Sequence, residues 1–157
     1  MVILRWEQGR GPVDGLLARG QLTRVTANRD MAGVLLGQAG AHVASAGAII
    51  ESDPSGAFAL AYDAARKALT AILVNQGLRA SGDGAHAVLL DVVRAQLDPP
   101  LGAVFRPFSW MRPLRNHTEY PTPDHPTATT DDVREALPAA TAMIDAAAKV
   151  IDQMPAY

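Results

Sequence analysis

The chain contains no cysteine, few aromatic residues and almost no lysine. Aromatic residues make up 5% of its 157 positions, and Lys67 and Lys149 are its only lysines. Without thiols, disulfides and cysteine-based metal sites are excluded, and a reducing compartment is compatible with the composition. The basic residues are therefore almost all arginine, whose guanidinium can hold a phosphate through two hydrogen bonds. A GC-rich genome would also favour Ala, Arg, Gly and Pro together, so the composition alone does not establish phosphate binding.

Sequence patterns of several protein classes are also missing. We find no apolar run that approaches the ~20 residues of a membrane span, and the first ten residues, MVILRWEQGR, are too short and too charged for a signal peptide. No HExxH pair of metal ligands, GK[ST] phosphate loop or GxSxG elbow occurs. The net charge of -2 does not favour nucleic acid by bulk electrostatics. We expect a cytoplasmic protein without cofactor, metal or membrane contact.

Alanine-rich segments with helical spacing dominate what is present. Alanine is the strongest helix former, and runs of β-branched residues with the two-residue period of a strand are missing. The sequence therefore predicts an all-α protein, an antiparallel bundle of about five to six helices. The helices are expected near residues 13–22, 29–50, 54–76, 85–97, 107–120 and from 129 onward.

The helix ends are predicted from local chemistry. Asn28 stands where a side chain accepts hydrogen bonds from the first turn of a helix, and the turn over 52–56, SDPSG, also provides the cap of the next helix. Gly77 is placed to end the second long helix, and Thr129 or Thr130 can cap the last one. The length predicts a single domain, 1–157, with an N-terminal arm over 1–12 and a proline-rich linker over 121–129. Pro138 either kinks the last helix or marks where its regular part begins.

The most distinctive stretch is residues 105–121, which read FRPFSWMRPLRNHTEYP. No acidic residue stands between Asp98 and Glu119, so the stretch is locally basic. Arg106, Trp110 and Glu119 are candidates for ligand binding. Aromatic rings can stack on bases when they are exposed, but packing in the core or in a dimer interface is the favoured interpretation of Trp110. Glu119 can instead form a surface ion pair with Arg115, four residues earlier.

The remaining histidines receive structural interpretations. His42 lies on a helix lined with Ala and Gly and is expected to be buried. His86 follows a glycine turn and is expected in a first helical turn. His125 lies in the proline-rich linker and is expected to be solvated.

The order of these segments resembles the HEPN superfamily, in particular its prokaryotic branch. A long Gly/Ala-rich helix precedes AYDAARKAL (61–69) and GAHAVLLDVVRAQL (84–97), followed by LRNHTEYP (114–121) and an acid-capped last helix. The likeness covers about 30–155. It implies a helical bundle that pairs as a homodimer.

In ribonucleases of this family, an arginine and a polar residue precede a histidine that follows the arginine by four to six positions. The arginine can hold the scissile phosphate, and the histidine can take a proton from the 2′-hydroxyl. Here Arg115 and Asn116 match the first two positions, but Tyr120 stands where the histidine is expected. The alternative pair, Arg112 and His117, has the right spacing but places Pro113 at the polar position.

Two classes of function follow from this resemblance. The first is a dimeric HEPN-like domain that binds RNA, a nucleotide or a partner protein, such as a cognate antitoxin or nucleotidyltransferase. The second is a metal-independent endoribonuclease of the toxin or defence type, with Arg112, Arg115 and His117 as catalytic residues and Asn116 and Tyr120 assisting. A purely structural homodimer held by the last helix is a third possibility. Because the motif departs from the ribonuclease pattern, the first class, a binding domain, is favoured.

Overall fold

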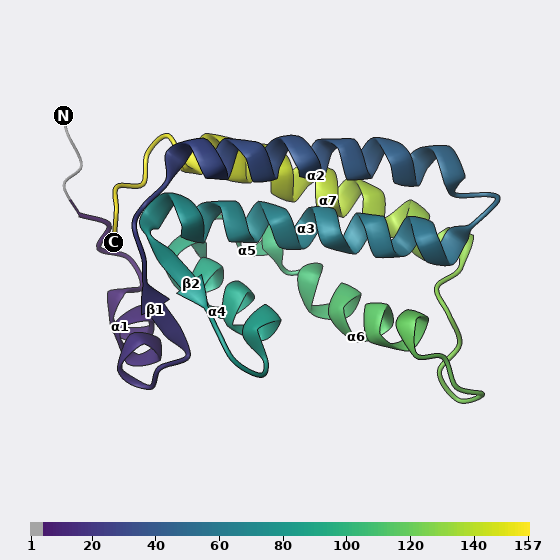
Figure 1. Ribbon diagram of the computed structural model, residues 1–157, viewed down its shortest axis with the longest axis horizontal. Helices are drawn as coiled ribbons and strands as arrows, with labels where there is room; N and C mark the ends of the chain where they lie inside the picture. Colours follow the sequence, from purple (N-terminus) through teal and green to yellow (C-terminus); the bar gives the residue numbers. More distant parts are fainter. Residues whose placement is uncertain (1–4) are drawn as a thin grey trace.

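The computed structural model describes residues 5–157 and is an all-α bundle, as the sequence predicts (Figure 1). Within these residues, six helices have nine or more residues, α5 has four, and the only sheet has two strands. In chain order the elements are α1 (Arg10–Ala18), β1 (Leu22–Arg24), α2 (Arg29–Ile49), α3 (Pro54–Gln76), β2 (Leu78–Ala80), α4 (Ala85–Leu97), α5 (Gly102–Phe105), α6 (Phe108–Glu119) and α7 (Thr130–Val150).

Local capping fixes the two longest helices of the first half. The Asn28 side chain accepts a hydrogen bond from the Met31 amide at 2.9 Å, and Asp53 accepts one from the Gly56 amide at 2.9 Å. At the end of α3, Gly77 has a φ of 76°, a left-handed conformation that glycine adopts without strain. A Cβ at Gly77 would also lie 2.6 Å from the Val25 carbonyl oxygen. These ends agree with those predicted from the sequence.

The last helix begins with a reciprocal cap. The Thr129 hydroxyl accepts a hydrogen bond from the Asp132 amide at 3.2 Å, and the Asp132 carboxylate accepts one from the Thr129 amide at 2.8 Å. Pro138 lies inside α7, which continues on both sides of it. The segment before Thr129 contains no helix, and Thr122 and His125 bridge there.

The N-terminal part differs from the prediction in two ways. Helix α1 begins at Arg10, so it takes in the last residues of the predicted arm over 1–12, whose residues 1–4 lie outside the described chain. Strands β1 and β2 pair antiparallel, with Thr23 opposite Arg79, although no sheet was predicted. Each strand has three residues, too few to display a recognisable two-residue period.

Helix α3 lies at the centre of the bundle, with α2 and α7 along one side and α4 and α6 along the other (Figure 1). Side chains of α3 such as Phe58, Leu69 and Ile72 are fully buried. The neighbouring helix α2 is different: only Ala32, Ala39 and Ala46 are buried on it. Helix α3 is therefore the core helix that positions the others.

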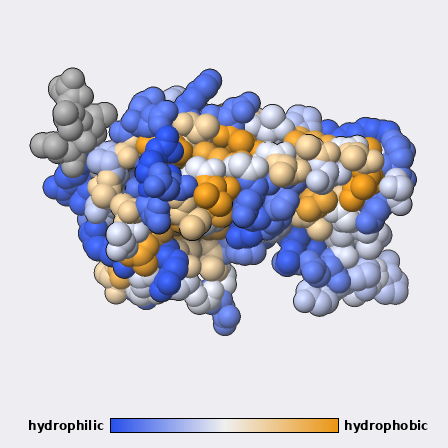
Figure 2. Space-filling view, turned by 45° about the horizontal axis from the view of Figure 1, so that its top comes forward, coloured by the Kyte–Doolittle hydropathy of each residue, from blue (hydrophilic) through white to orange (hydrophobic). Residues whose placement is uncertain are grey.

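The outer face of α2 is apolar and exposed. Met31 is 46% exposed and Val34 is 51% exposed, and hydrophobic residues gather along this side of the molecule (Figure 2). By length and composition α2 could cross a membrane, although only 17% of its apolar window is buried. The expectation that no apolar run approaches the length of a membrane span was therefore wrong. The interval between Asp30 and Glu51 contains no Asp, Glu, Lys or Arg.

Candidate functional site

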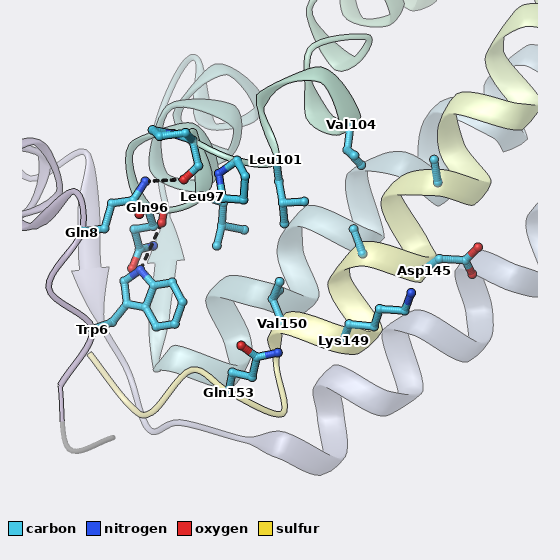
Figure 3. A pocket seen from close by; sticks show the side chains of 14 residues that line it. Trp6, Gln8, Gln96, Leu97, Leu101, Val104, Asp145, Lys149, Val150 and Gln153 are labelled. Atoms are coloured by element: carbon cyan, nitrogen blue, oxygen red, sulfur yellow. Dashed lines mark hydrogen bonds between the residues drawn. The ribbon is translucent and has the colours of Figure 1, made fainter. Parts of the chain in front are cut away.

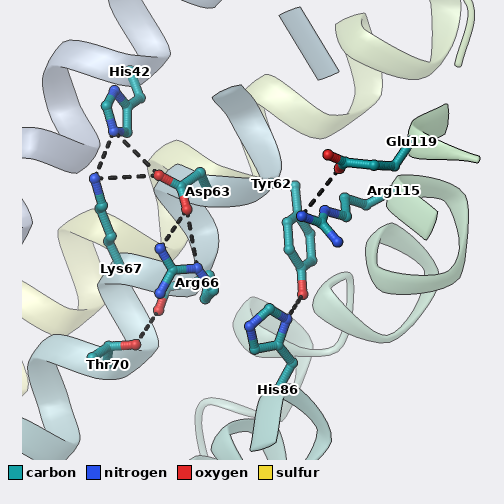
Figure 4. Close-up of polar contacts among 9 residues, drawn as sticks. All are labelled: His42, Tyr62, Asp63, Arg66, Lys67, Thr70, His86, Arg115 and Glu119. Carbon is teal, nitrogen blue, oxygen red and sulfur yellow. Dashed lines mark hydrogen bonds and ion pairs between the residues drawn. The ribbon is translucent and has the colours of Figure 1, made fainter. Parts of the chain in front are cut away.

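A buried tyrosine and a histidine join α3 to the start of α4. Tyr62 is 2% exposed, and its hydroxyl lies 2.7 Å from Nδ1 of His86 (Figure 4). The Tyr62 ring stacks on Phe108 of α6 with 5.3 Å between the ring centroids. His86 stands in the first turn of α4, after Gly84, whose φ of 80° turns the chain into the helix. The start of α4 and Tyr62 of α3 thus position the imidazole, and Phe108 of α6 packs against Tyr62.

Burial and positive charge keep the His86 ring neutral. Burial, followed by the charges of Arg66, Arg115 and Arg112, lowers the pKa of His86 below its usual 6.5. Burial also raises the pKa of Tyr62 to about 12, so its hydroxyl is protonated at neutral pH. His86 is the hydrogen-bond partner of this hydroxyl within residues 5–157. Because a buried donor without an acceptor is costly, Tyr62 donates to Nδ1, and the neutral ring carries its own proton on Nε2.

The imidazole borders two hollows, which together we call the His86 cleft. One hollow has a volume of about 320 Å³ and is lined by Gly82, Asp83, Gly84, Ala85, His86, Arg112 and Asn116. The other has about 280 Å³, and its polar lining includes Arg66, Thr70, Arg79 and His86. Within the described residues Arg112 and Arg79 form no ion pair. The cleft therefore offers two guanidinium groups without a direct ion pair to any described residue beside a neutral imidazole, with the Asp83 carboxylate also in the lining of the Arg112 hollow.

The three predicted catalytic residues do not face one another within the chain. Arg112 lines the His86 cleft, whereas Arg115 pairs with Glu119 at 3.0 Å and lies over the Tyr62 ring at 5.9 Å (Figure 4). His117 stacks on His125 of the linker, with 4.1 Å between the centroids. Arg112 and His117 are five positions apart on α6, a rotation of about 140° around the helix, which directs the two side chains to different sides.

The other predicted residues divide between cleft, core and surface. Asn116 lies one turn after Arg112 and lines the same hollow. The Trp110 ring is half-buried and packs against Phe58 at 6.2 Å. Arg106 is exposed next to α5, and Tyr120 is 75% exposed at the end of α6. Only Asn116 of these four thus shares the hollow with Arg112.

A second polar cluster ties α2 to α3. The Asp63 carboxylate lies 3.3 Å from His42 Nε2 and 3.2 Å from Lys67 Nζ, and it also pairs with Arg66 (Figure 4). Burial alone would raise the pKa of Asp63, but hydrogen bonds and charges from Arg66 and Lys67 outweigh it and lower that pKa. His42 is half-buried in this cluster and so is less enclosed than predicted. In residues 5–157, no three His, Asp or Glu side chains are arranged to hold a metal ion.

The sequence did not indicate the central pair of the site. Tyr62 and His86 are separated by 24 positions and lie on different helices, so no spacing rule connects them. The glycines before His86 were the available signal, since they place it at an exposed helix start near the basic segment. Arg66 and Arg79 gave no signal beyond their charge.

Comparison with known proteins identifies the family. The model of the HEPN family, described as the HEPN domain, matches residues 34–151, which is most of the chain. No curated protein and no solved structure matches the chain. The matched range agrees with the resemblance seen in the sequence, and it contains α3, α4 and α6, from which the His86 cleft is built. This chain belongs to the HEPN family.

Proposed function

We propose that the protein is a dimeric HEPN-like domain that binds single-stranded RNA through the His86 cleft. The observation that supports this most directly is Arg112, which has no ion-pair partner in the described chain and shares a hollow with His86 and Asn116, although Asp83 also lines that hollow. Guanidinium groups contact phosphates through two hydrogen bonds. Arg79 at the other hollow would hold a second phosphate. A cytoplasmic location, where RNA is abundant, is part of the proposal.

His86 contributes to binding as a hydrogen-bond donor. With Tyr62 donating to Nδ1, the outward Nε2–H points its hydrogen at an acceptor, such as a phosphate or a base oxygen. A neutral donor suits a site that already holds several arginines, because a further positive charge would be repelled by them. The same tautomer makes His86 unsuitable as a proton acceptor, which favours binding over cleavage.

The dimer is proposed to form through the exposed face of α2. Met31 and Val34 are unusually exposed for apolar side chains, and a Cβ at Gly33, Gly37 or Gly40 would meet no atom within 4 Å. A second copy of α2 could approach this face closely and bury it. Because α3 lies between α2 and α6 (Figure 1), this arrangement leaves the two His86 clefts on opposite outer sides. Each cleft then binds RNA by itself.

Binding is tested by fluorescence anisotropy with a labelled single-stranded RNA of mixed sequence at low salt. Arg112→Ala should weaken binding by about tenfold, since a charged hydrogen bond is worth roughly 1.5–3 kcal/mol. Arg94→Ala is the matched control, because Arg94 is exposed on α4 and lines neither hollow. Equal affinity of the Arg112→Ala protein and the wild type would contradict the proposal. No binding by the wild type would instead favour a partner protein as the ligand.

Arg106→Ala distinguishes the cleft from the basic surface predicted from the sequence. Arg106 is exposed and lies outside both hollows. RNA held in the cleft should leave this variant with an affinity close to that of the wild type. A loss as large as that of Arg112→Ala would place the RNA along the 105–121 stretch instead.

The second candidate is a metal-independent endoribonuclease, favoured by the imidazole and the guanidinium in one open hollow. In that reaction a base takes the 2′-hydroxyl proton, the 2′-oxygen bonds to phosphorus, and the bond to the 5′-oxygen breaks, with water protonating the leaving oxygen. His117 or the other tautomer of His86 would be the base. RNA degradation with EDTA present, abolished by His86→Ala or His117→Ala, would establish this activity. Intact RNA after prolonged incubation with the wild type would exclude it.

A further inference from the structure

A second cavity lies on the other side of α4, away from the arginines of the His86 cleft. It has a volume of about 620 Å³ and lies between the α4–α5 connection, α7 and the N-terminal segment (Figure 3). This volume is within the range of about 300–1,000 Å³ that small-molecule sites occupy. Its walls are mostly apolar and include Leu97, Leu101, Val104 and Val150.

The wall that closes this cavity is held in place by hydrogen bonds. The Trp6 indole N–H donates to the Gln96 carbonyl at 3.1 Å, and the Gln8 amide donates to the Pro99 carbonyl at 2.8 Å (Figure 3). A Cβ at Gly9 would lie 2.3 Å from the Ala95 carbonyl oxygen, so the chain lies directly against α4 there. The flat indole is thus a fixed side of the cavity.

The two charged side chains of the cavity lie on α7. Asp145 and Lys149 stand at the end opposite Trp6 (Figure 3), and both are exposed. Neither side chain forms a hydrogen bond or ion pair with a residue of the described chain. Lys149 can lay its methylene stem along the apolar wall while its ammonium stays at the rim.

We propose that this cavity binds a small amphipathic anion with a ring-containing apolar body. The body would lie between Trp6 and the apolar side chains of α5 and α7. The anionic head, a carboxylate or sulfonate, would accept hydrogen bonds from the Lys149 ammonium. Asp145 disfavours a second negative charge on the ligand, so a single anionic group fits the rim best. This site is separate from the proposed RNA site.

The test uses two fluorescent probes that differ in charge. Anilinonaphthalene sulfonate carries the required ring system and anion, and N-phenylnaphthylamine is its neutral counterpart. The folded wild-type protein should bind one sulfonate probe per chain. Lys149→Gln should lower the affinity for the sulfonate probe by about threefold, as expected for an exposed ion pair. It should leave the affinity for the neutral probe unchanged. Equal effects on both probes would contradict the anionic head group.

Blocking variants locate the probe. Ala146→Phe places a ring in the cavity and should abolish binding, whereas Ala148→Phe adds the same ring to an exposed position of α7 outside the cavity. Val104→Gln, on the short helix α5, makes the cavity wall polar and changes no residue of α7. It provides a second test of the cavity if the Ala146→Phe protein does not fold.

Val34→Ser reduces the other apolar surface, on α2, and should leave the probe affinity unchanged. RNA binding should persist in every variant. Binding that survives both Ala146→Phe and Val104→Gln, or that Val34→Ser abolishes, would overturn the proposed site.

Discussion

Helices α2 and α3 lie side by side and are both rich in alanine, yet they have opposite environments. Ile72 and Leu69 of α3 are fully buried, whereas Val34 of α2 is 51% exposed. Fully burying an aliphatic side chain stabilises a fold by about 1.5–3 kcal/mol, so α3 holds the bundle together. Leu35, Leu36 and Val43 of α2 pack partly against the core, but the exposed side chains of Met31 and Val34 add little to the folded monomer. An apolar surface without such a role is characteristic of an interaction face.

The largest expected effect separates the two helices by stability. Ile72→Ala should lower the free energy of unfolding by about 3 kcal/mol, because it opens a cavity in a packed core. Val34→Ala should change it by less than about 0.5 kcal/mol, as exposed substitutions do. Urea unfolding followed by circular dichroism measures both, at a protein concentration low enough to keep the chain monomeric. Similar losses in the two variants would show that Val34 is packed in the folded monomer.

A smaller effect concerns self-association through α2. Val34→Lys should raise the dissociation constant of the dimer at least tenfold, about 1.4 kcal/mol, because it places a charge in an apolar interface. Ala148→Lys on α7 is the matched control and tests the prediction that the last helix holds the dimer. Sedimentation velocity over a range of concentrations measures both. Dissociation by Ala148→Lys alone would assign the interface to α7.

The contrast between α2 and α3 could not be predicted from the sequence, although their ends could. Asn28, Asp53 and Gly77 act within a few residues, so local chemistry was enough to predict where the helices begin and end. Which apolar face becomes buried depends on the helices that pack against it. The pairing of Tyr62 with His86 also depends on how the helices pack. The sequence therefore indicated the basic stretch 105–121 but not the His86 imidazole that lies beside it.

Acid should weaken the fold through His86. Because burial and the nearby arginines lower its pKa in the folded chain, the unfolded chain takes up this proton first as the pH falls. The free energy of unfolding should therefore decrease below about pH 6.5, the usual value for histidine, down to the folded-state pKa. His86→Asn should reduce this slope in denaturation measured from pH 8 to pH 5. A slope unchanged in the variant would show that His86 is not responsible.

The smallest effects on stability are expected from replacing one glycine of α3 and one glycine of α2 by alanine. A Cβ at Gly56 in the first turn of α3 would lie 2.1 Å from the Asp53 carboxylate that caps the helix, whereas one at Gly37 of α2 would meet no atom within 4 Å. Gly56→Ala should cost about 1 kcal/mol by disturbing the cap. Gly37→Ala should stabilise the monomer by about 0.5–1 kcal/mol, since alanine is the better helix former.

Gly37 also separates monomer stability from association. If α2 packs closely against a second copy, Gly37→Ala raises the melting temperature of the dilute monomer and at the same time weakens the dimer, because the added methyl group holds the two helices apart. Thermal melts at low concentration and sedimentation at high concentration would show the two changes with opposite signs. A stabilised monomer with unchanged association would place Gly37 outside the interface. An interface along this stretch of α2 is what makes one substitution raise the melting temperature of the monomer and weaken the dimer.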